Sequence, residues 1–326
     1  MTQQLRLVFG TSRAIQQVVA DCMRYAGVGY PLLILGARGT GKSVVARHIH
    51  VLSQRSGDFI KESGAAIPEH LEVSHLAGHA RGAFTGADSD RVGLLESAHR
   101  GTFFLDELAL ASAKVQQILL HLLDDGVIRR VGEVRARLVD VRFIAATNAD
   151  LEDMVEAGLF RRDLRDRFGF LVLKLPSLAE RQDEILALAD VFLQLEAAEL
   201  GLQARPVLSQ QVRDCFLAAA WKGNIRELEA VCRYAVLHAA PGQPIEIDDL
   251  PPDFIATLGD VLRIRHDQSA AERAQVALAR AGGNKAKAAR LLGVSRQHFY
   301  RLLAGVSALL LCDFCNLWTD VSAWLM

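Results

Sequence analysis

Apolar and polar positions follow two different periods along the first half of the chain. Short apolar runs rich in β-branched and aromatic residues predict five strands, at residues 32–35, 58–61, 102–105, 141–146 and 171–175. The stretches between them carry apolar residues at helical spacing and predict helices at 42–53, 112–124 and 151–156. Strands that alternate with helices in this way indicate a parallel sheet covered by helices, an α/β fold.

The second half of the chain predicts helices and no sheet. Three amphipathic helices are expected at 178–200, 209–220 and 224–239, as a small helical unit. Residues 241–261 hold four of the eight prolines, a composition typical of a linker with short turns. Beyond it, apolar periodicity and glycine breaks predict three more helices, at 271–281, 285–292 and 295–303.

Composition and charge narrow the class of protein. Hydrophobic residues make up 51% of the chain and charged residues 23%, which excludes a disordered or collagen-like protein. The net charge of −1 gives no overall field that would attract nucleic acid. Residues 262–303, however, hold nine Lys and Arg against two acidic residues, so a nucleic-acid-binding surface is expected there.

The cysteines and the apolar runs indicate in which cellular compartment the protein lies. The five cysteines are scattered, and the one Cys-x-x-Cys pair lacks a second pair that would complete a zinc site. This pattern fits a reducing compartment. The chain shows no signal-peptide pattern, and no apolar run reaches the ~18 residues that span a bilayer. We therefore expect a cytoplasmic protein with no membrane partner.

The first chemical motif along the chain is the octapeptide Gly36-Ala37-Arg38-Gly39-Thr40-Gly41-Lys42-Ser43. It follows one predicted strand and opens a predicted helix, which is the context of a phosphate-binding loop rather than of a plain glycine-rich turn. Its glycines let backbone N–H groups face phosphates. Lys42 would contact the β- and γ-phosphates, and the Ser43 hydroxyl would bind Mg²⁺.

Polar side chains follow two further predicted strands. Asp106 and Glu107 end the run 102–105, where one carboxylate can hold the Mg²⁺ shell and the other can orient a water molecule. Alone, this pair could equally be an exposed acidic strand end. Thr147 and Asn148 end the next strand, at the sheet edge where open α/β sheets bind ligands.

Two arginine-bearing segments lie further on, at residues 160–168 and 221–228. Arginines beside a transferred phosphoryl group neutralise the charge that spreads over its oxygens. Spacing alone does not separate such arginines from solvated helix charges, so both interpretations stand at this point.

A sixth motif is the hexapeptide Gly82-Ala83-Phe84-Thr85-Gly86-Ala87. Its two glycines flank a Phe-Thr tip, so the loop can extend and retract while it presents one aromatic ring. With the motifs above, the chain resembles the bacterial enhancer-binding proteins, the AAA+ activators of sigma-54 RNA polymerase. The resemblance covers residues 10–305, and the layout is similar to the phage-shock-protein F type, which has no N-terminal regulatory domain.

This resemblance implies roles for the motif residues. Gly36 to Ser43 would be the Walker A loop, with Asp106 and Glu107 as the Walker B pair. Thr147 and Asn148 would be sensor I, and Arg226 sensor II. Arg161 and Arg167 would be arginine fingers offered to a neighbouring subunit, which implies a hexameric ring with ATP and Mg²⁺ between subunits. Residues 82–87 would contact the sigma-54 factor.

The sequence departs from the family pattern at two positions. Ser63 stands where the family usually has an Asn that couples to Glu107. A serine can still donate a hydrogen bond to Glu107, but its shorter reach predicts weaker nucleotide sensing. Lys222 stands where Pro is typical, and this change is expected to be tolerated.

The basic C-terminal segment resembles a Fis-type helix-turn-helix domain, read from Gly283 to Arg301. Its third helix would lie in the major groove of enhancer DNA. The expected contacts fall to Ser295, which caps that helix, to Arg296, Gln297 and His298 at base edges, and to Lys285, Lys287 and Arg301 at phosphates. A basic helical hairpin used only for packing is the alternative.

Together these observations predict five segments. They are an AAA+ α/β ATPase subdomain at 1–175, a helical lid at 176–240, a linker at 241–261, a Fis-type DNA-binding domain at 262–305 and an atypical apolar tail at 306–326. The resemblance implies an activator that hydrolyses ATP to convert the closed complex of the RNA polymerase holoenzyme to the open complex. The alternatives are a DNA-binding regulator with a weakened ATPase that needs a partner subunit, and a AAA+ remodeller of another substrate. Without a receiver domain, control by a regulatory protein acting in trans is expected.

Overall fold

The computed structural model describes residues 10, 12–169, 171–202, 204–240, 242–258, 275, 277–279, 281, 283–291 and 299. The chain divides into two compact units, residues 1–208 with 220–245 and residues 209–219 with 246–326. The helical unit expected at 176–240 therefore contributes residues to both.

The first unit is built on a five-stranded parallel sheet. Its order is β2 (Phe59–Ser63), β5 (Thr102–Asp106), β8 (Arg142–Thr147), β1 (Leu32–Leu35) and β9 (Val172–Lys174). All five predicted strands are present, with bounds that shift by two residues at most. The predicted α/β fold class is thus confirmed.

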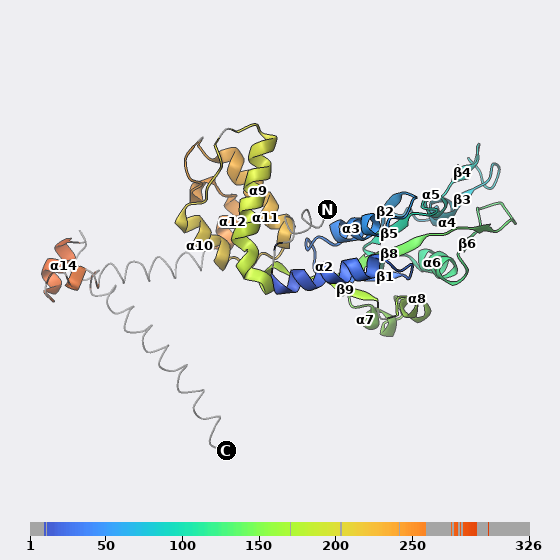
Figure 1. Cartoon of the computed structure of the whole chain (residues 1–326), viewed down its shortest axis with the longest axis horizontal. Coiled ribbons are helices and arrows are strands. Elements are labelled where there is room, and N and C mark those ends of the chain that lie inside the picture. Colours follow the sequence, from blue (N-terminus) through green and yellow to red (C-terminus); the bar gives the residue numbers. More distant parts are fainter. Residues whose placement is uncertain are drawn as a thin grey trace, which may run out of the picture. The chain divides into compact units, whose positions relative to one another are not determined.

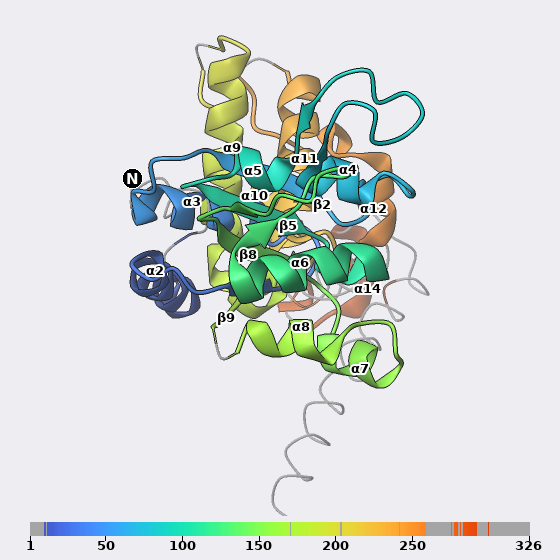
Figure 2. The same ribbon diagram turned by 90° about the vertical axis from the view of Figure 1, so that its right-hand side faces the viewer.

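Helices cover both faces of this sheet (Figures 1 and 2). Successive side chains of a strand point to opposite faces, so a strand buried on both sides reads as a continuous apolar run. Leu33, Phe103 and Phe143 pack in one core with α6 (Ala113–Asp125). α3 (Lys42–Ser53) contacts β1, β5 and β8, and α2 (Arg13–Ala26) packs against α3.

Shorter helices complete the α/β part of this unit. They are α4 (Glu72–Ala77), α5 (Leu94–Ser97), the 3₁₀ turn η1 (Leu108–Leu110), α7 (Leu151–Glu156) and α8 (Arg162–Arg167). Leu151 of α7 and Leu164 of α8 are buried in the core that contains α6. Both helices are therefore fixed by one or two apolar anchors rather than by a long amphipathic face.

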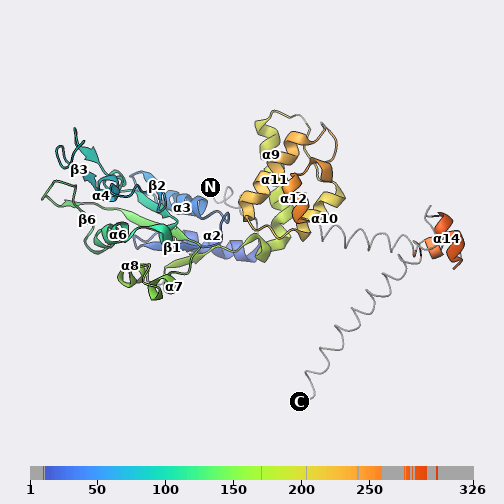
Figure 3. The same ribbon diagram turned by 180° about the vertical axis from the view of Figure 1, so that it is seen from behind.

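Two small hairpins lie at the end of the α/β layer that is remote from α9 and α11 (Figure 3). One pairs β3 (Gly78–His79) with β4 (Arg91–Val92), and the other pairs β6 (Val127–Ile128) with β7 (Arg137–Leu138). Backbone hydrogen bonds join them, from Ala80 N to Val131 O and from Val131 N to Gly78 O, each 2.9 Å. The two loops are therefore one connected surface feature.

The helices of the first unit after the sheet are η2 (Leu178–Glu184), α9 (Ile185–Glu199) and α11 (Asn224–His238). The single helix predicted at 178–200 is wrong at its start, because Arg181 has non-helical φ/ψ values of −142° and 50°. Ser177 and Glu180 form a capping box that starts a separate short turn. The buried Arg181 guanidinium then lies 3.6 Å from the Glu184 carboxylate.

The second unit contains α10 (Gln210–Ala218), η3 (Ile247–Asp249), α12 (Pro252–Thr257) and α14 (Lys285–Leu291). The segment expected to be a linker thus carries a helix, which Pro252 opens. The ring of Phe254 is buried and meets Phe216 edge-on at 5.9 Å. Ala288 and Ala289 of α14 are buried against Ala277, Ala281 and Phe299, as the small residues of a close helix packing predict.

Within the described residues, no helix combines the length and the apolar character needed to cross a membrane.

Candidate nucleotide-binding site

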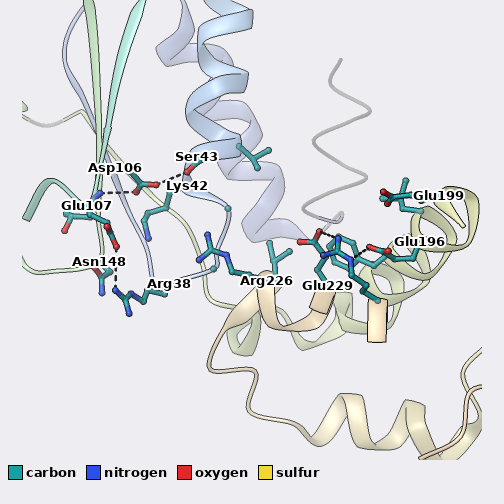
Figure 4. A pocket seen from close by; sticks show the side chains of 18 residues that line it. Arg38, Lys42, Ser43, Asp106, Glu107, Asn148, Glu196, Glu199, Arg226 and Glu229 are labelled. Atoms are coloured by element: carbon teal, nitrogen blue, oxygen red, sulfur yellow. Dashed lines mark hydrogen bonds and ion pairs between the residues drawn. The ribbon is translucent and has the colours of Figure 1, made fainter. Parts of the chain in front are cut away.

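A cavity of about 890 Å³ lies at the carboxyl ends of the central strands (Figure 4). It brings together most of the site residues that the sequence predicts for the nucleotide. Its walls include Arg38, Gly39, Gly41, Lys42, Ser43, Asp106, Glu107, Thr147, Asn148 and Arg226. The parallel sheet explains this gathering, because its strands all end at the same edge.

The octapeptide forms the loop that the phosphate interpretation requires. Gly39 and Gly41 have φ values of 76° and 94°, which glycine adopts without strain. The Lys42 Nζ donates to the carbonyl oxygens of Gly36 at 2.8 Å and Ala37 at 3.0 Å, so the ammonium is held within the loop. Burial holds the pKa of Lys42 below its usual range, and the nearby Asp106 and Glu107 oppose this shift.

The two carboxylates after β5 have separate partners. Asp106 Oδ2 accepts a hydrogen bond of 2.9 Å from the Ser43 hydroxyl. Glu107 Oε2 accepts one of 3.0 Å from the Ser63 hydroxyl, so the predicted contact between Ser63 and Glu107 is confirmed. The guanidinium of Arg38 lies 3.6 Å from Glu107 Oε1. Glu107 itself has a φ of 52°, a left-handed conformation that is uncommon for a non-glycine residue.

The sequence analysis missed Lys61, which reaches the same place from β2. Its Nζ donates to Ser43 Oγ at 2.9 Å and lies 3.5 Å from Asp106 Oδ2. The alternation of side chains along a strand could have found it, because Lys61 shares a face of β2 with Ser63. An ammonium held by these two oxygens is a stand-in cation, so Ser43 and Asp106 fit Mg²⁺, which prefers oxygen ligands.

Asn224 is a second residue that the sequence analysis missed. It is buried, and its Nδ2 donates to the carbonyl of Arg38 at 2.8 Å while its Oδ1 accepts from the Leu178 N–H at 2.7 Å. A Cβ atom on Gly39 would lie only 1.9 Å from the carbonyl oxygen of Gly223. The loop before α11 is thus packed directly on the phosphate-binding loop, which places Arg226 at the cavity.

Besides Arg226, four charged side chains of α9 and α11 line the other end of the cavity and were not predicted: Glu196, Glu199, Glu229 and Arg233. Arg233 donates to Glu196 Oε1 at 2.9 Å and to Glu229 Oε1 at 3.4 Å, and Glu199 lies nearby (Figure 4). This end of the cavity is therefore acidic, in contrast to the cationic phosphate loop.

Arg161 and Arg167 do not line this cavity. Arg161 pairs with Asp163 at 2.7 Å and Arg167 with Asp124 at 2.6 Å, and about half of each arginine side chain is exposed. Both lie on or beside α8, so the structure does not bring them to the nucleotide-binding residues of their own chain.

The hexapeptide 82–87 forms a closed loop after β3. Its ends are joined by a 2.8 Å hydrogen bond from Gly82 N to Ala87 O, and Gly82 and Gly86 have positive φ values of 75° and 94°. The half-exposed ring of Phe84 meets the His79 ring edge-on, with centroids 4.9 Å apart. Ser74 Oγ lies 2.7 Å from His79 Nδ1 and fixes that imidazole.

The predicted DNA contacts fall partly within the described residues. Lys285 begins α14 and is exposed, and Lys287 lies on the same helix. Ser295, Arg296, Gln297, His298 and Arg301 lie outside the described residues.

Three family descriptions match the chain in order. They are the Sigma-54 interaction domain at residues 8–174, the AAA+ ATPase lid domain at 179–260 and the bacterial regulatory protein, Fis family, at 272–304. The first spans about half of the chain and contains the phosphate-binding loop, the carboxylate pair and the Phe84 loop.

Similar proteins carry the same combination. The Psp operon transcriptional activator of Escherichia coli K12 is 39% identical, over 91% of this chain and 96% of that protein. The DNA-binding transcriptional regulator NtrC of the same organism is 40% identical, over 91% of this chain and 69% of its own length. The nitric oxide reductase transcription regulator NorR2 of Cupriavidus necator is 36% identical, over 90% of this chain and 62% of its own.

Solved structures agree with these relatives. NtrX from Brucella abortus in complex with ADP matches with a TM-score of 0.70 and 29% identity, over 91% of this chain and 69% of that one. The same protein in complex with ATP matches with a TM-score of 0.68. A closed-state reconstruction of Hsp104 is 18% identical with a TM-score of 0.54 and shares the fold alone. The chain belongs to the sigma-54-dependent transcriptional activators, which join a AAA+ ATPase to a Fis-type DNA-binding domain.

Proposed function

We propose that this chain binds enhancer DNA, assembles as a hexameric ring and uses ATP hydrolysis to convert the closed complex of sigma-54 RNA polymerase holoenzyme to the open complex. The observation that carries the proposal is the cavity in which Lys42, Ser43 and the Asp106–Glu107 pair meet, in a chain that also presents Phe84 on a glycine-hinged loop. The Phe84 loop disfavours another substrate, because it lies within the region that matches the Sigma-54 interaction domain.

The proposed hydrolysis assigns a task to each group. Lys42 would hold the β- and γ-phosphate oxygens, and Ser43 with Asp106 would hold Mg²⁺. The bound metal neutralises charge on the phosphates. Glu107 would accept a proton from, and orient, the attacking water, while the hydrogen bond from Ser63 fixes the direction of its carboxylate. Thr147 and Asn148, at the end of β8, would sense the γ-phosphate.

The proposed ring would explain why Arg161 and Arg167 do not line the nucleotide cavity of their own chain. Arg161 and Arg167 are exposed beside α8, and a second copy of the chain would bring a nucleotide to them. A finger supplied in trans stabilises the charge of the transition state, an effect of about 10³–10⁵ in rate. Bound to chromosomal DNA, such a ring would act in the cytoplasm. Control by a separate regulatory protein stays a prediction.

ATP turnover measured against protein concentration tests this proposal. We expect cooperative turnover that Glu107→Gln and Arg167→Ala both abolish. Binding to the sigma-54 factor should require an ATP transition-state analogue and should be lost in Phe84→Ala, whose turnover remains. Analogue-dependent binding that survives Phe84→Ala would contradict the role of the loop.

A second candidate is a regulator whose ATPase depends on a partner subunit, and Ser63 is the observation that favours it. If that candidate holds, the purified chain shows no turnover at any concentration, and adding a homologous activator subunit restores it. Turnover by the chain alone excludes it.

A further inference from the structure

Lys61, Ser43 and Asp106 form a closed triangle of contacts at the edge of the sheet. The Ser43 hydroxyl donates to Asp106 Oδ2 at 2.9 Å and accepts from Lys61 Nζ at 2.9 Å. The Lys61 ammonium lies 3.5 Å from the same Oδ2. The only two protein oxygens that we assign to the metal therefore already share one positive charge.

The described part of the protein offers little else to a metal. Among the described residues, no group of three or more His, Cys, Asp or Glu is placed to hold an ion. Mg²⁺ in nucleotide sites is held by one or two protein oxygens, with water and phosphate oxygens completing its octahedron. Without the phosphates, the affinity of this site for a divalent ion rests on Ser43 and Asp106 alone, and Lys61 competes for both.

Lys42 and Arg38, two cations that line the cavity, do not compete with a metal for Ser43 and Asp106, because they have other partners. The ammonium of Lys42 is bound to the carbonyls of Gly36 and Ala37, and the guanidinium of Arg38 lies beside Glu107. Lys61 comes from a different strand, and 47% of its side chain is exposed, so its ammonium can move into solvent and return. In the same position its ammonium lies 5.8 Å from the centroid of the Phe104 ring on the neighbouring strand.

We propose that Lys61 is a tethered competitor of the metal, which makes metal binding depend on nucleotide. Its ammonium neutralises Asp106 and blocks Ser43 until phosphate oxygens supply the further negative charge that favours a divalent ion over a single ammonium. This proposal rests on the metal ligands assigned under the proposed function. It implies that metal enters the site together with nucleotide and binds poorly on its own.

Mn²⁺ provides a direct probe, because the electron paramagnetic resonance signal of free Mn²⁺ reports the bound fraction without any turnover. Titrations compare the full chain with Lys61→Met and Lys61→Gln, each with and without ADP. Lys174→Met is the matched control, because Lys174 is an exposed strand lysine on β9, the opposite edge strand of the sheet.

We expect both Lys61 variants to bind Mn²⁺ alone at least tenfold more tightly than the natural chain and Lys174→Met. The gain in Mn²⁺ affinity that ADP provides should shrink in the same two variants. Equal or weaker Mn²⁺ affinity without ADP, including no measurable binding in any variant, overturns the proposal. Asp106→Asn distinguishes a failure of the metal-ligand assignment from a failure of the competition proposal. If Asp106→Asn still shows ADP-dependent Mn²⁺ binding, the assignment of Asp106 as a metal ligand is wrong. If Asp106→Asn loses that binding but both Lys61 variants bind Mn²⁺ as the natural chain does, only the competition by Lys61 is refuted.

Discussion

At the scale of single residues, the Glu107 carboxylate that we propose as catalytic accepts a hydrogen bond from the short side chain of Ser63. Ser63→Ala should lower the turnover number of ATP hydrolysis about tenfold or more, because a hydrogen bond to a charged group contributes about 1.5–3 kcal/mol and Arg38 alone lies too far from Glu107 to replace it. Steady-state kinetics at saturating ATP measures this. Ser53→Ala is the control, since Ser53 only donates to the carbonyl of His50 at the end of α3. A turnover number unchanged in Ser63→Ala would contradict the positioning role.

Sequence patterns predicted the motif residues of this site and missed two of their partners. Asp106, Glu107 and Ser63 end neighbouring strands, so parallel pairing alone predicts that they meet. Lys61 shares a face of β2 with Ser63, so strand alternation places it near the site, but its partner Ser43 lies on α3, and only the packing of that helix on the sheet reveals the contact. Asn224 joins segments more than 180 residues apart, a contact that no local pattern encodes.

At the scale of elements, the contact between the phosphate-binding loop and the loop before α11 has no spare room. Gly39→Ala should abolish ADP binding, whereas Gly158→Ala should leave ADP binding in place. Gly39→Ala should also lower the melting temperature more than Gly158→Ala does. Both glycines have φ near 70–76°, so both alanines bear the same backbone strain, but a Cβ on Gly39 meets the Gly223 carbonyl whereas one on Gly158 meets nothing within 4 Å. Differential scanning calorimetry and ADP titration measure the two effects. Equal losses in both variants would show that strain, and not the contact, dominates.

The Phe84 loop gives a second prediction at this scale. His79→Ala removes the ring that Phe84 rests on, so the phenyl ring should become more available, and binding to sigma-54 should need less of the transition-state analogue. His121→Ala, an exposed residue of α6, is the control. Fluorescence anisotropy with labelled sigma-54 gives the analogue concentration at half-maximal binding. A shift toward higher concentrations would mean that His79 presents the ring rather than retains it.

Element bounds show where sequence reasoning succeeds. The central strands β1, β5 and β8 were predicted well because burial on both faces leaves continuous apolar runs. The region 178–200 was not, because its turn is set by the capping box of Ser177 and by the buried Arg181, and apolar spacing continues across both. Pro251 and Pro252 suggested a linker, although proline also opens helices.

At the scale of the whole molecule, the proposed fingers Arg161 and Arg167 would act on a neighbour's nucleotide. Lys42→Ala and Arg167→Ala should each be inactive alone and regain part of the turnover when mixed, because a mixed ring contains interfaces with an intact Lys42 on one side and an intact Arg167 on the other. The measurement is ATPase activity at constant total protein and varied ratio. Activity that never exceeds the sum of the separate variants would place the fingers in cis. Residue spacing within one chain does not predict which subunit receives these arginines, and their assignment to a neighbour comes from the family resemblance.

The hydrogen bonds between the two hairpins have a mechanical consequence. Two backbone hydrogen bonds join residues 78–80 to Val131, which pair in parallel. A force that pulls the Phe84 tip along the chain direction would therefore load both hydrogen bonds at the same time, in shear. The base of the loop is therefore anchored in two hairpins, and bending is left to Gly82 and Gly86, which flank the tip. A movement that starts at the nucleotide would displace the Phe84 tip, because the base of the loop would stretch little.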